Sequence, residues 1–202
     1  MPEFTSYASG TPCWTDITSP ELDRSVSFYS DLFGWEAEQD PRPEAGGYTM
    51  FKRNGEYVAA GSPPFPGSED PAHWTTYIAS DDVDATAARV SESGGTLLTE
   101  PFDVLDAERM AVAQDPGGAT FGIWQAGAHH VLSSRMSLAL SSGTSARRLT
   151  REGGGVLPRS IRLRGRHDAV GDSPLHRVLK IDGKSIGGLM PIGPEMGELP
   201  PN

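Results

Sequence analysis

Residues 12–35, "PCWTDITSPELDRSVSFYSDLFGW", contain the pattern that decides the fold. The first six residues alternate as a β-strand does, and Ser19 and Pro20 then resemble a helix start, with Ser19 as the N-cap. Apolar side chains follow at helical spacing, at Leu22, Val26, Tyr29, Leu32 and Phe33. The stretch therefore predicts a strand followed by an amphipathic helix.

The pattern then continues and starts again. A hairpin is predicted from "GGYTMFKR" and "EYVAAGS", because the Asn54-Gly55 pair between them tolerates the positive φ of a tight turn. After the Pro-rich linker 63–71, a strand at 73–80 and a helix at 81–95 repeat the order. Three further strands are predicted at 96–101, 109–115 and 119–125. We therefore predict an α+β fold made of two βαβββ repeats.

These residues resemble one complete module of the vicinal oxygen chelate superfamily. The resemblance is carried by the helix string "DRSVSFYSDLFGW" and by "QDPGGATFGIW" near the end of the second repeat. It implies that residues 1–128 form a glyoxalase/bleomycin-resistance-like module of two half-barrels. Dioxygenases belong to the same superfamily, and many members carry two modules as a tandem repeat.

A second, incomplete module is predicted after the first. Residues 179–191, "LKIDGKSIGGLMP", echo residues 51–63, "FKRNGEYVAAGSP", at a distance of 128 positions. Between the copies, residues 131–170 contain eight arginines and no aromatic residue, so this irregular segment is either a disordered basic tail or coding sequence read out of frame. We expect 129–202 to be a damaged and truncated second module that keeps a short hairpin.

Composition limits the functional classes. Residues 1–130 carry 6 Lys and Arg against 21 Asp and Glu, which argues against nucleic acid as a partner. The sequence has neither an apolar run long enough to cross a membrane nor a signal peptide, so we expect a cytoplasmic protein. The single cysteine, Cys13, excludes an internal disulfide and is expected to be a buried thiol.

The resemblance also locates four positions at which metal-dependent members of the superfamily hold their ion. Here these positions are occupied by Trp14, Phe51, Thr75 and Gly122, none of which is a metal ligand. His73 and the pair His129-His130 are expected to be surface residues. No cofactor is predicted, although the resemblance leaves a divalent metal open.

The same inward positions predict a metal-free site. By strand alternation, Trp14 and Asp16 share one face, as do Thr75 and Tyr77, and Gly122 and Trp124. We expect Trp14, Asp16, Thr75, Tyr77 and Trp124 to bind a small planar organic molecule, with Asp16 as the one candidate for acid-base chemistry.

Other interpretations remain open at this point. The aromatic residues could simply fill the core of the fold. The protein could be a metal-dependent lyase or dioxygenase whose missing ligands come from elsewhere, or a non-functional frameshifted product. Because a lost half-module leaves apolar surface uncovered, we also expect a homodimer.

Overall fold

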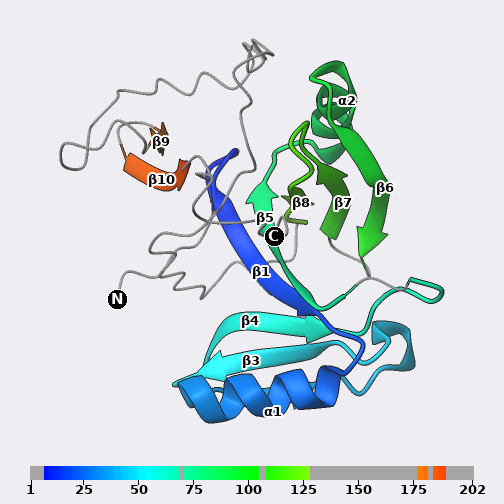
Figure 1. Ribbon diagram of the computed structural model, residues 1–202, viewed down its shortest axis with the longest axis vertical. Helices are drawn as coiled ribbons and strands as arrows, with labels where there is room; N and C mark the ends of the chain where they lie inside the picture. The colour runs from blue at the N-terminus through cyan, green and yellow to red at the C-terminus, as the bar shows by residue number, and fades with distance from the viewer. Residues whose placement is uncertain (1–6, 69–70, 105–107, 128–176, 182–183, 190–202) are drawn as a thin grey trace, which may run out of the picture. The chain divides into compact units, whose positions relative to one another are not determined.

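The computed structural model describes residues 7–68, 71–104, 108–127, 177–181 and 184–189 (Figure 1). The chain divides into two compact units. Among the described residues, the first unit contains Tyr7 and Cys13–Tyr77, and the second contains Ala8–Pro12, the chain from Ile78 to 127, and a separate hairpin. Each unit is described by itself below.

The first unit is a mixed sheet with one long helix. Its strands lie in the order β2-β3-β4-β1-β5. In chain order the elements are β1 (Pro12–Thr18), α1 (Leu22–Phe33), β2 (Glu36–Gln39), the 3₁₀ turn η1 (Pro43–Ala45), β3 (Thr49–Arg53), β4 (Glu56–Ser62) and β5 (His73–Ala79). The hairpin between β3 and β4 turns through Asn54 and Gly55, which have φ values of 54° and 80°. This confirms the predicted turn.

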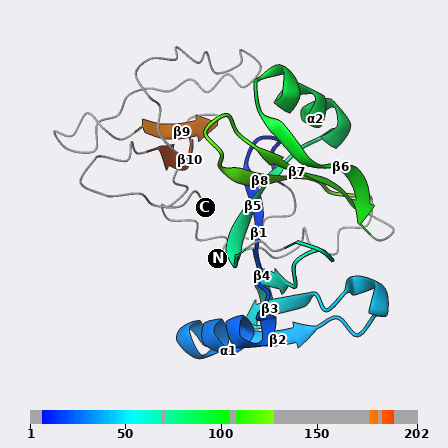
Figure 2. The same cartoon turned by 45° about the vertical axis from the view of Figure 1, so that its right-hand side comes forward.

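One face of this sheet packs against α1 (Figure 2). Ile17, Phe51 and Ala59 form the buried core on that face, and Tyr29 of α1 packs against them. β1 lies parallel to β4, with Asp16 opposite Ala60. Because side chains alternate along a strand, Asp16 and Ala60 face away from α1 when Ile17 and Ala59 face toward it.

The start of α1 differs from the prediction. The N-cap is Glu21 rather than Ser19, and its side chain makes no cap hydrogen bond. Ser19 instead stabilises the turn before the helix, since its Oγ accepts a hydrogen bond from the Glu21 backbone N–H at 3.2 Å and from the Ser25 hydroxyl at 2.8 Å. The serine-proline pair thus belongs to the turn that leads into the helix. The C-cap is Gly34 in the left-handed conformation.

The second unit repeats the arrangement of one helix against a sheet. Helix α2 (Val83–Glu92) is followed by the strands β6 (Thr96–Val104), β7 (Glu108–Gln114) and β8 (Thr120–Gln125), which lie in the order β8-β7-β6. Asp82 caps α2 by accepting a hydrogen bond from the Ala85 backbone N–H at 2.9 Å. Val83, Ala111, Ala113 and Ile123 form the core between helix and sheet.

The separate hairpin consists of β9 (Arg177–Ile181) and β10 (Lys184–Leu189). Its pairing matches that of β3 and β4 when 128 is added to each residue number: Gly187 lies opposite Leu179 as Ala59 lies opposite Phe51. The irregularity of register also falls at the same place in both hairpins. The two strands predicted for this segment are therefore present.

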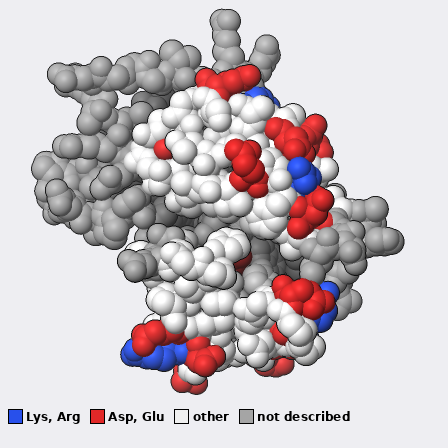
Figure 3. All heavy atoms as spheres, turned by 90° about the vertical axis from the view of Figure 1, so that its right-hand side faces the viewer, with Lys and Arg blue, Asp and Glu red and all other residues white. Residues whose placement is uncertain are grey.

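The βαβββ pattern of residues 12–125 confirms the predicted fold class. Residues 131–170, the pair His129-His130 and residues 182–183 of the predicted hairpin lie outside the described residues. Within the described part, no helix is long and apolar enough to span a membrane. On the face shown in Figure 3, acidic side chains gather over the described surface with few basic side chains beside them.

Candidate functional site

The face of the first unit that points away from α1 holds a buried polar cluster. Its centre is Asp16, which is only 6% exposed. Asp16 Oδ2 accepts a hydrogen bond from the hydroxyl of Tyr77 on the neighbouring strand at 3.1 Å. β1 and β5 are held together there by the Thr15 hydroxyl, which donates to the Thr75 carbonyl at 3.0 Å, and by the Cys13 thiol, which contacts the Tyr77 carbonyl at 3.5 Å.

The charge of Asp16 has no compensating cation among the described residues. Burial raises the pKa of its carboxyl to about 7, and the hydrogen bond from Tyr77 opposes this rise. Burial and the neighbouring Asp16 raise the pKa of the Tyr77 hydroxyl, so this tyrosine keeps its proton and remains a donor. A carboxyl that titrates near neutral pH can accept or donate a proton under ordinary conditions.

Aromatic side chains flank this carboxyl. Trp14 is 4% exposed, and its Nε1–H donates a hydrogen bond to the Tyr48 hydroxyl at 3.1 Å. Thr75, on β5 with Tyr77, is also buried. The first unit therefore brings together four of the five predicted site residues, Trp14, Asp16, Thr75 and Tyr77, on or beside one sheet face. Within the first unit they form a buried cluster that combines aromatic rings, hydroxyl groups and the Asp16 carboxyl.

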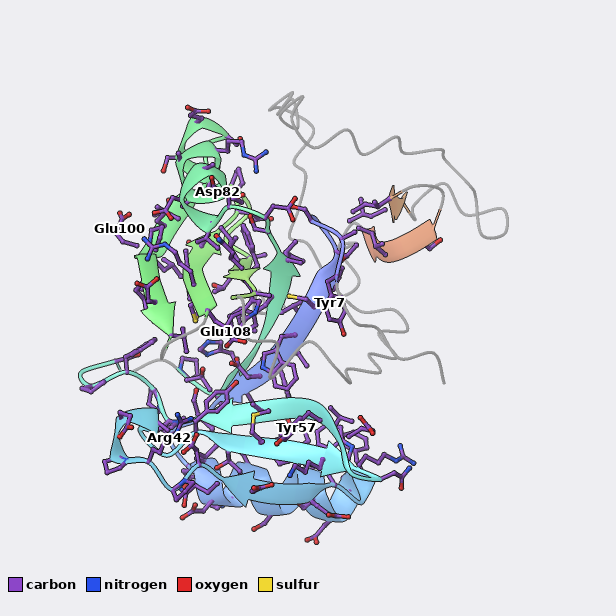
Figure 4. The ribbon with its side chains drawn as sticks, turned by 180° about the vertical axis from the view of Figure 1, so that it is seen from behind. Tyr7, Arg42, Tyr57, Asp82, Glu100 and Glu108 are labelled. Atoms are coloured by element: carbon purple, nitrogen blue, oxygen red, sulfur yellow. The ribbon has the colours of Figure 1, made fainter. Side chains whose placement is uncertain are left out.

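Replacing Tyr77 with phenylalanine should raise the pKa of Asp16 above its value of about 7, because the tyrosine hydroxyl favours the charged carboxylate. The measurement is an NMR titration of the Asp16 carboxyl carbon. Tyr57→Phe is the matched control, because Tyr57, labelled in Figure 4, lies on β4 three positions before Ala60, the strand partner of Asp16. The Nζ atom of Lys52 lies 4.8 Å from the centre of the Tyr57 ring. An unchanged or lower pKa in Tyr77→Phe would contradict the assigned hydrogen bond.

The remaining inward positions are placed as follows. Trp124 and Gly122 lie on β8 of the second unit, where they pair with Met110 and Val112 of β7. The hairpin position was predicted incorrectly, because Phe51 is fully buried in the core against α1 and does not share the face of Asp16. A neighbouring residue, Met50, pairs with Ala60 and shares that face.

Two residues of functional interest were not predicted. Tyr48 follows a glycine pair and precedes β3, so alternation along a strand gives no information about its direction. Glu108 begins β7, and burial raises the pKa of its carboxyl to about 7. The sequence alone does not show toward which face of the sheet Glu108 points, because this follows from the strand register, in which Glu108 pairs with Val104.

The described residues do not fit a divalent metal ion. Strand alternation and register also place His73 of β5 and Glu38 of β2 on the face of Asp16. The Nδ1 atom of His73 lies 2.9 Å from the Pro71 carbonyl oxygen, and Glu38 forms an ion pair with Lys52, so neither is assigned to a metal site. The described part of the chain contains no group of three or more His, Cys, Asp or Glu side chains that could hold a metal. Structural and catalytic metal sites need at least three such ligands.

Comparisons with known proteins agree with the fold. Residues 13–123 match the model of the Glyoxalase/Bleomycin resistance protein/Dioxygenase superfamily. CFP32 of Mycobacterium bovis, by its name a candidate glyoxylase, is 44% identical over 132 residues, covering 64% of this chain and 51% of that protein. The anthracycline biosynthesis protein DnrV of Streptomyces peucetius is 43% identical over 137 residues, covering 61% and 50%. The chain thus spans about half the length of these curated relatives.

A solved structure, the Mn(II)-bound glyoxalase from Novosphingobium aromaticivorans, resembles the chain at 17% identity with a TM-score of 0.44, covering 69% of this chain and 44% of that one. The superfamily match spans more than half of the 202 residues and includes both βαβββ repeats. The chain belongs to the Glyoxalase/Bleomycin resistance protein/Dioxygenase superfamily.

Proposed function

We propose that this protein binds a small organic molecule without a metal ion, and that Asp16 is the polar centre of the binding site. The observation that carries the proposal is the buried Asp16–Tyr77 pair on the face of the first sheet opposite α1. A carboxyl held at 6% exposure, with no basic side chain paired to it in the described part of the chain, costs folding free energy, and such groups cluster at functional sites.

The residues around Asp16 indicate the ligand chemistry. Trp14 and Tyr48 provide aromatic rings against which a planar ligand would pack. The Trp14 indole N–H already donates a hydrogen bond to the Tyr48 hydroxyl. Asp16 then remains as the group that a ligand hydroxyl or amine would reach. Trp124 lies on β8 of the second unit, and its role in ligand binding stays a prediction.

The absence of a metal is proposed on the chemistry of the side chains. Tryptophan, threonine and glycine occupy the superfamily positions at Trp14, Thr75 and Gly122, and none of them supplies a carboxylate, imidazole or thiolate side chain for a metal ion. Metal-assisted lyase or dioxygenase chemistry would need ligands from outside the described residues.

We also propose that residues 129–202 are the remnant of a second module. The matching register of β9–β10 and β3–β4, with an irregularity at the corresponding pair, supports this proposal, because register and bulges are specific features of a strand pair. The nucleotide sequence of the gene tests the out-of-frame explanation for 131–170. Homodimer formation remains a prediction, tested by sedimentation.

The binding proposal predicts that 2-naphthol binds the purified full chain in the presence of a chelator. Asp16→Asn should weaken this binding about tenfold or more, because the ligand hydroxyl loses a charge-assisted partner. Isothermal titration calorimetry above pH 7 measures both affinities. Asp23→Asn, an exposed aspartate on α1, is the matched control and should bind as the wild type does.

Elemental analysis of the same preparation completes the test. We expect far less than one zinc, iron or manganese ion per chain before any chelator is added. About one ion per chain, together with binding that disappears on chelation, would overturn the metal-free proposal. Binding that is equal in the wild type and Asp16→Asn would remove Asp16 from the site.

A further inference from the structure

The second unit has its own apolar sheet face with a carboxyl group in it. Ala111 and Ala113 of β7 pack toward α2, so Glu108, Met110 and Val112 face the other side of the sheet. Paired residues on neighbouring antiparallel strands share a face, and Met110 is paired with Phe102 on β6 and with Trp124 on β8. Phe102, Met110 and Trp124 therefore form one row across three strands. We call this row with Glu108 the Glu108 face.

Glu108, labelled in Figure 4, lies in the next row of this face, because the strand register pairs it with Val104 of β6. Its side chain is half-buried, and no hydrogen bond or ion pair to it is formed within the described residues. Burial alone raises the pKa of its carboxyl to about 7. Val104 on the paired strand and Met110 two positions along β7 are apolar neighbours on this face, and apolar side chains replace water without offering a hydrogen-bond donor.

The nearest basic side chain along the strand is turned to the other face. Arg109 donates hydrogen bonds to Asp84 Oδ2 at 2.7 Å and to Asp103 Oδ1 at 2.8 Å. Its guanidinium group is therefore paired with these two carboxylates and not with Glu108. Within the described residues, this leaves the carboxyl of Glu108 beside an aromatic and thioether surface with no cation of the protein to neutralise it.

We propose that the Glu108 face binds the cationic amine of a small aromatic ligand, with Glu108 as the residue that selects the charge. The aromatic ring would lie against Trp124, Met110 and Phe102, and the ammonium group would donate to Glu108. The excess of 21 acidic over 6 basic residues in 1–130 also favours a cation over an anion. This inference rests on the proposed function only for the premise that the protein binds a small aromatic molecule, and it assigns a charge preference to the second unit's own sheet face.

A pair of matched probes tests the charge selection. 2-Naphthylmethylamine is a cation at pH 8, and 2-naphthylmethanol has the same ring with a neutral hydroxyl group. We expect the wild-type full chain to bind the amine about tenfold more tightly than the alcohol, since a carboxylate forms a stronger hydrogen bond with a charged donor. Glu108→Gln should reduce this ratio to about one and leave the affinity for the alcohol unchanged.

Two further variants test whether the preference for the amine comes from Glu108. Glu92→Gln changes an exposed glutamate of α2, on the opposite side of the sheet, and should keep the wild-type ratio. Asp16→Asn tests whether Asp16 rather than Glu108 selects the amine. If the preference for the amine over the alcohol is lost in Asp16→Asn and kept in Glu108→Gln, the inference is overturned. Equal binding of the two probes by the wild type would also overturn it. If neither probe binds the wild type, the proposed small-molecule function fails together with the inference.

Discussion

Asp16→Asn should make the protein more stable than the wild type above pH 7, and the gain should disappear near pH 4. The pKa of Asp16 is about 7 in the folded chain against 3.8 as its ordinary value. Between these values the folded state holds a proton that the unfolded state has released. The free energy of unfolding of the wild type therefore falls as pH rises from about 4 to about 7.

The expected size follows from the difference of about three pKa units, which corresponds to about 4 kcal/mol. Asparagine has the same shape and still accepts from Tyr77, but it carries no charge to bury. The measurement is urea unfolding of both proteins at pH 4 and pH 8. The difference between their unfolding free energies should grow by about 4 kcal/mol across this range.

Asp23→Asn again serves as the control, because Asp23 is exposed on α1. Its stability difference from the wild type should change little between the two pH values. All other titrating groups are common to the proteins compared, so their contributions to the pH dependence of the unfolding free energy cancel in the difference. A constant difference between Asp16→Asn and the wild type would show that Asp16 is solvated in the folded protein.

Phe51→Ala should destabilise the protein by about 3 to 5 kcal/mol. Phe51 is fully buried in the first unit, with its ring centroid 5.3 Å from that of Trp35 and 6.4 Å from that of Tyr29. Truncation removes apolar contact on both sides and leaves a cavity that α1 and the sheet cannot close without moving.

The matched control for this truncation is Phe65→Ala, since Phe65 lies in the linker after β4 and is 67% exposed. It should cost less than about 1 kcal/mol. Urea unfolding at a single pH measures both variants. A loss in Phe51→Ala as small as that in Phe65→Ala would mean that α1 does not pack on the sheet as described.

Local signals in the sequence predicted the elements that depend on local chemistry. The Asn54-Gly55 turn follows from the conformational freedom of two adjacent residues, and both have the expected positive φ. Strand β2 was not located, because its four residues, Glu36–Gln39, are all exposed and have no apolar alternation. An edge strand of this kind is defined by its pairing with β3 rather than by its own composition.

In the candidate site, too, the features set by local sequence were predicted and those set by pairing between distant strands were not. Alternation along β1 correctly grouped Trp14 with Asp16, because both are buried on the face away from α1. The hydrogen bond from Tyr77 could not be predicted, since it joins residues 61 positions apart. Phe51 was misplaced by one residue along its strand, and a shift of one residue moves a side chain to the opposite face.

The parallel pairing of β1 with β4 has a consequence for the order in which the first unit folds. The β3–β4 hairpin closes through a two-residue turn and can form within microseconds. β1 is synthesised first, yet its partner in the sheet lies 44 positions later at Thr18 and Ser62. Closing that larger loop costs more chain entropy, so we expect β1 to pair with β4 after the β3–β4 hairpin has formed. We therefore expect the Asp16 carboxylate to stay hydrated during folding until β5, which carries its partner Tyr77, pairs beside β1.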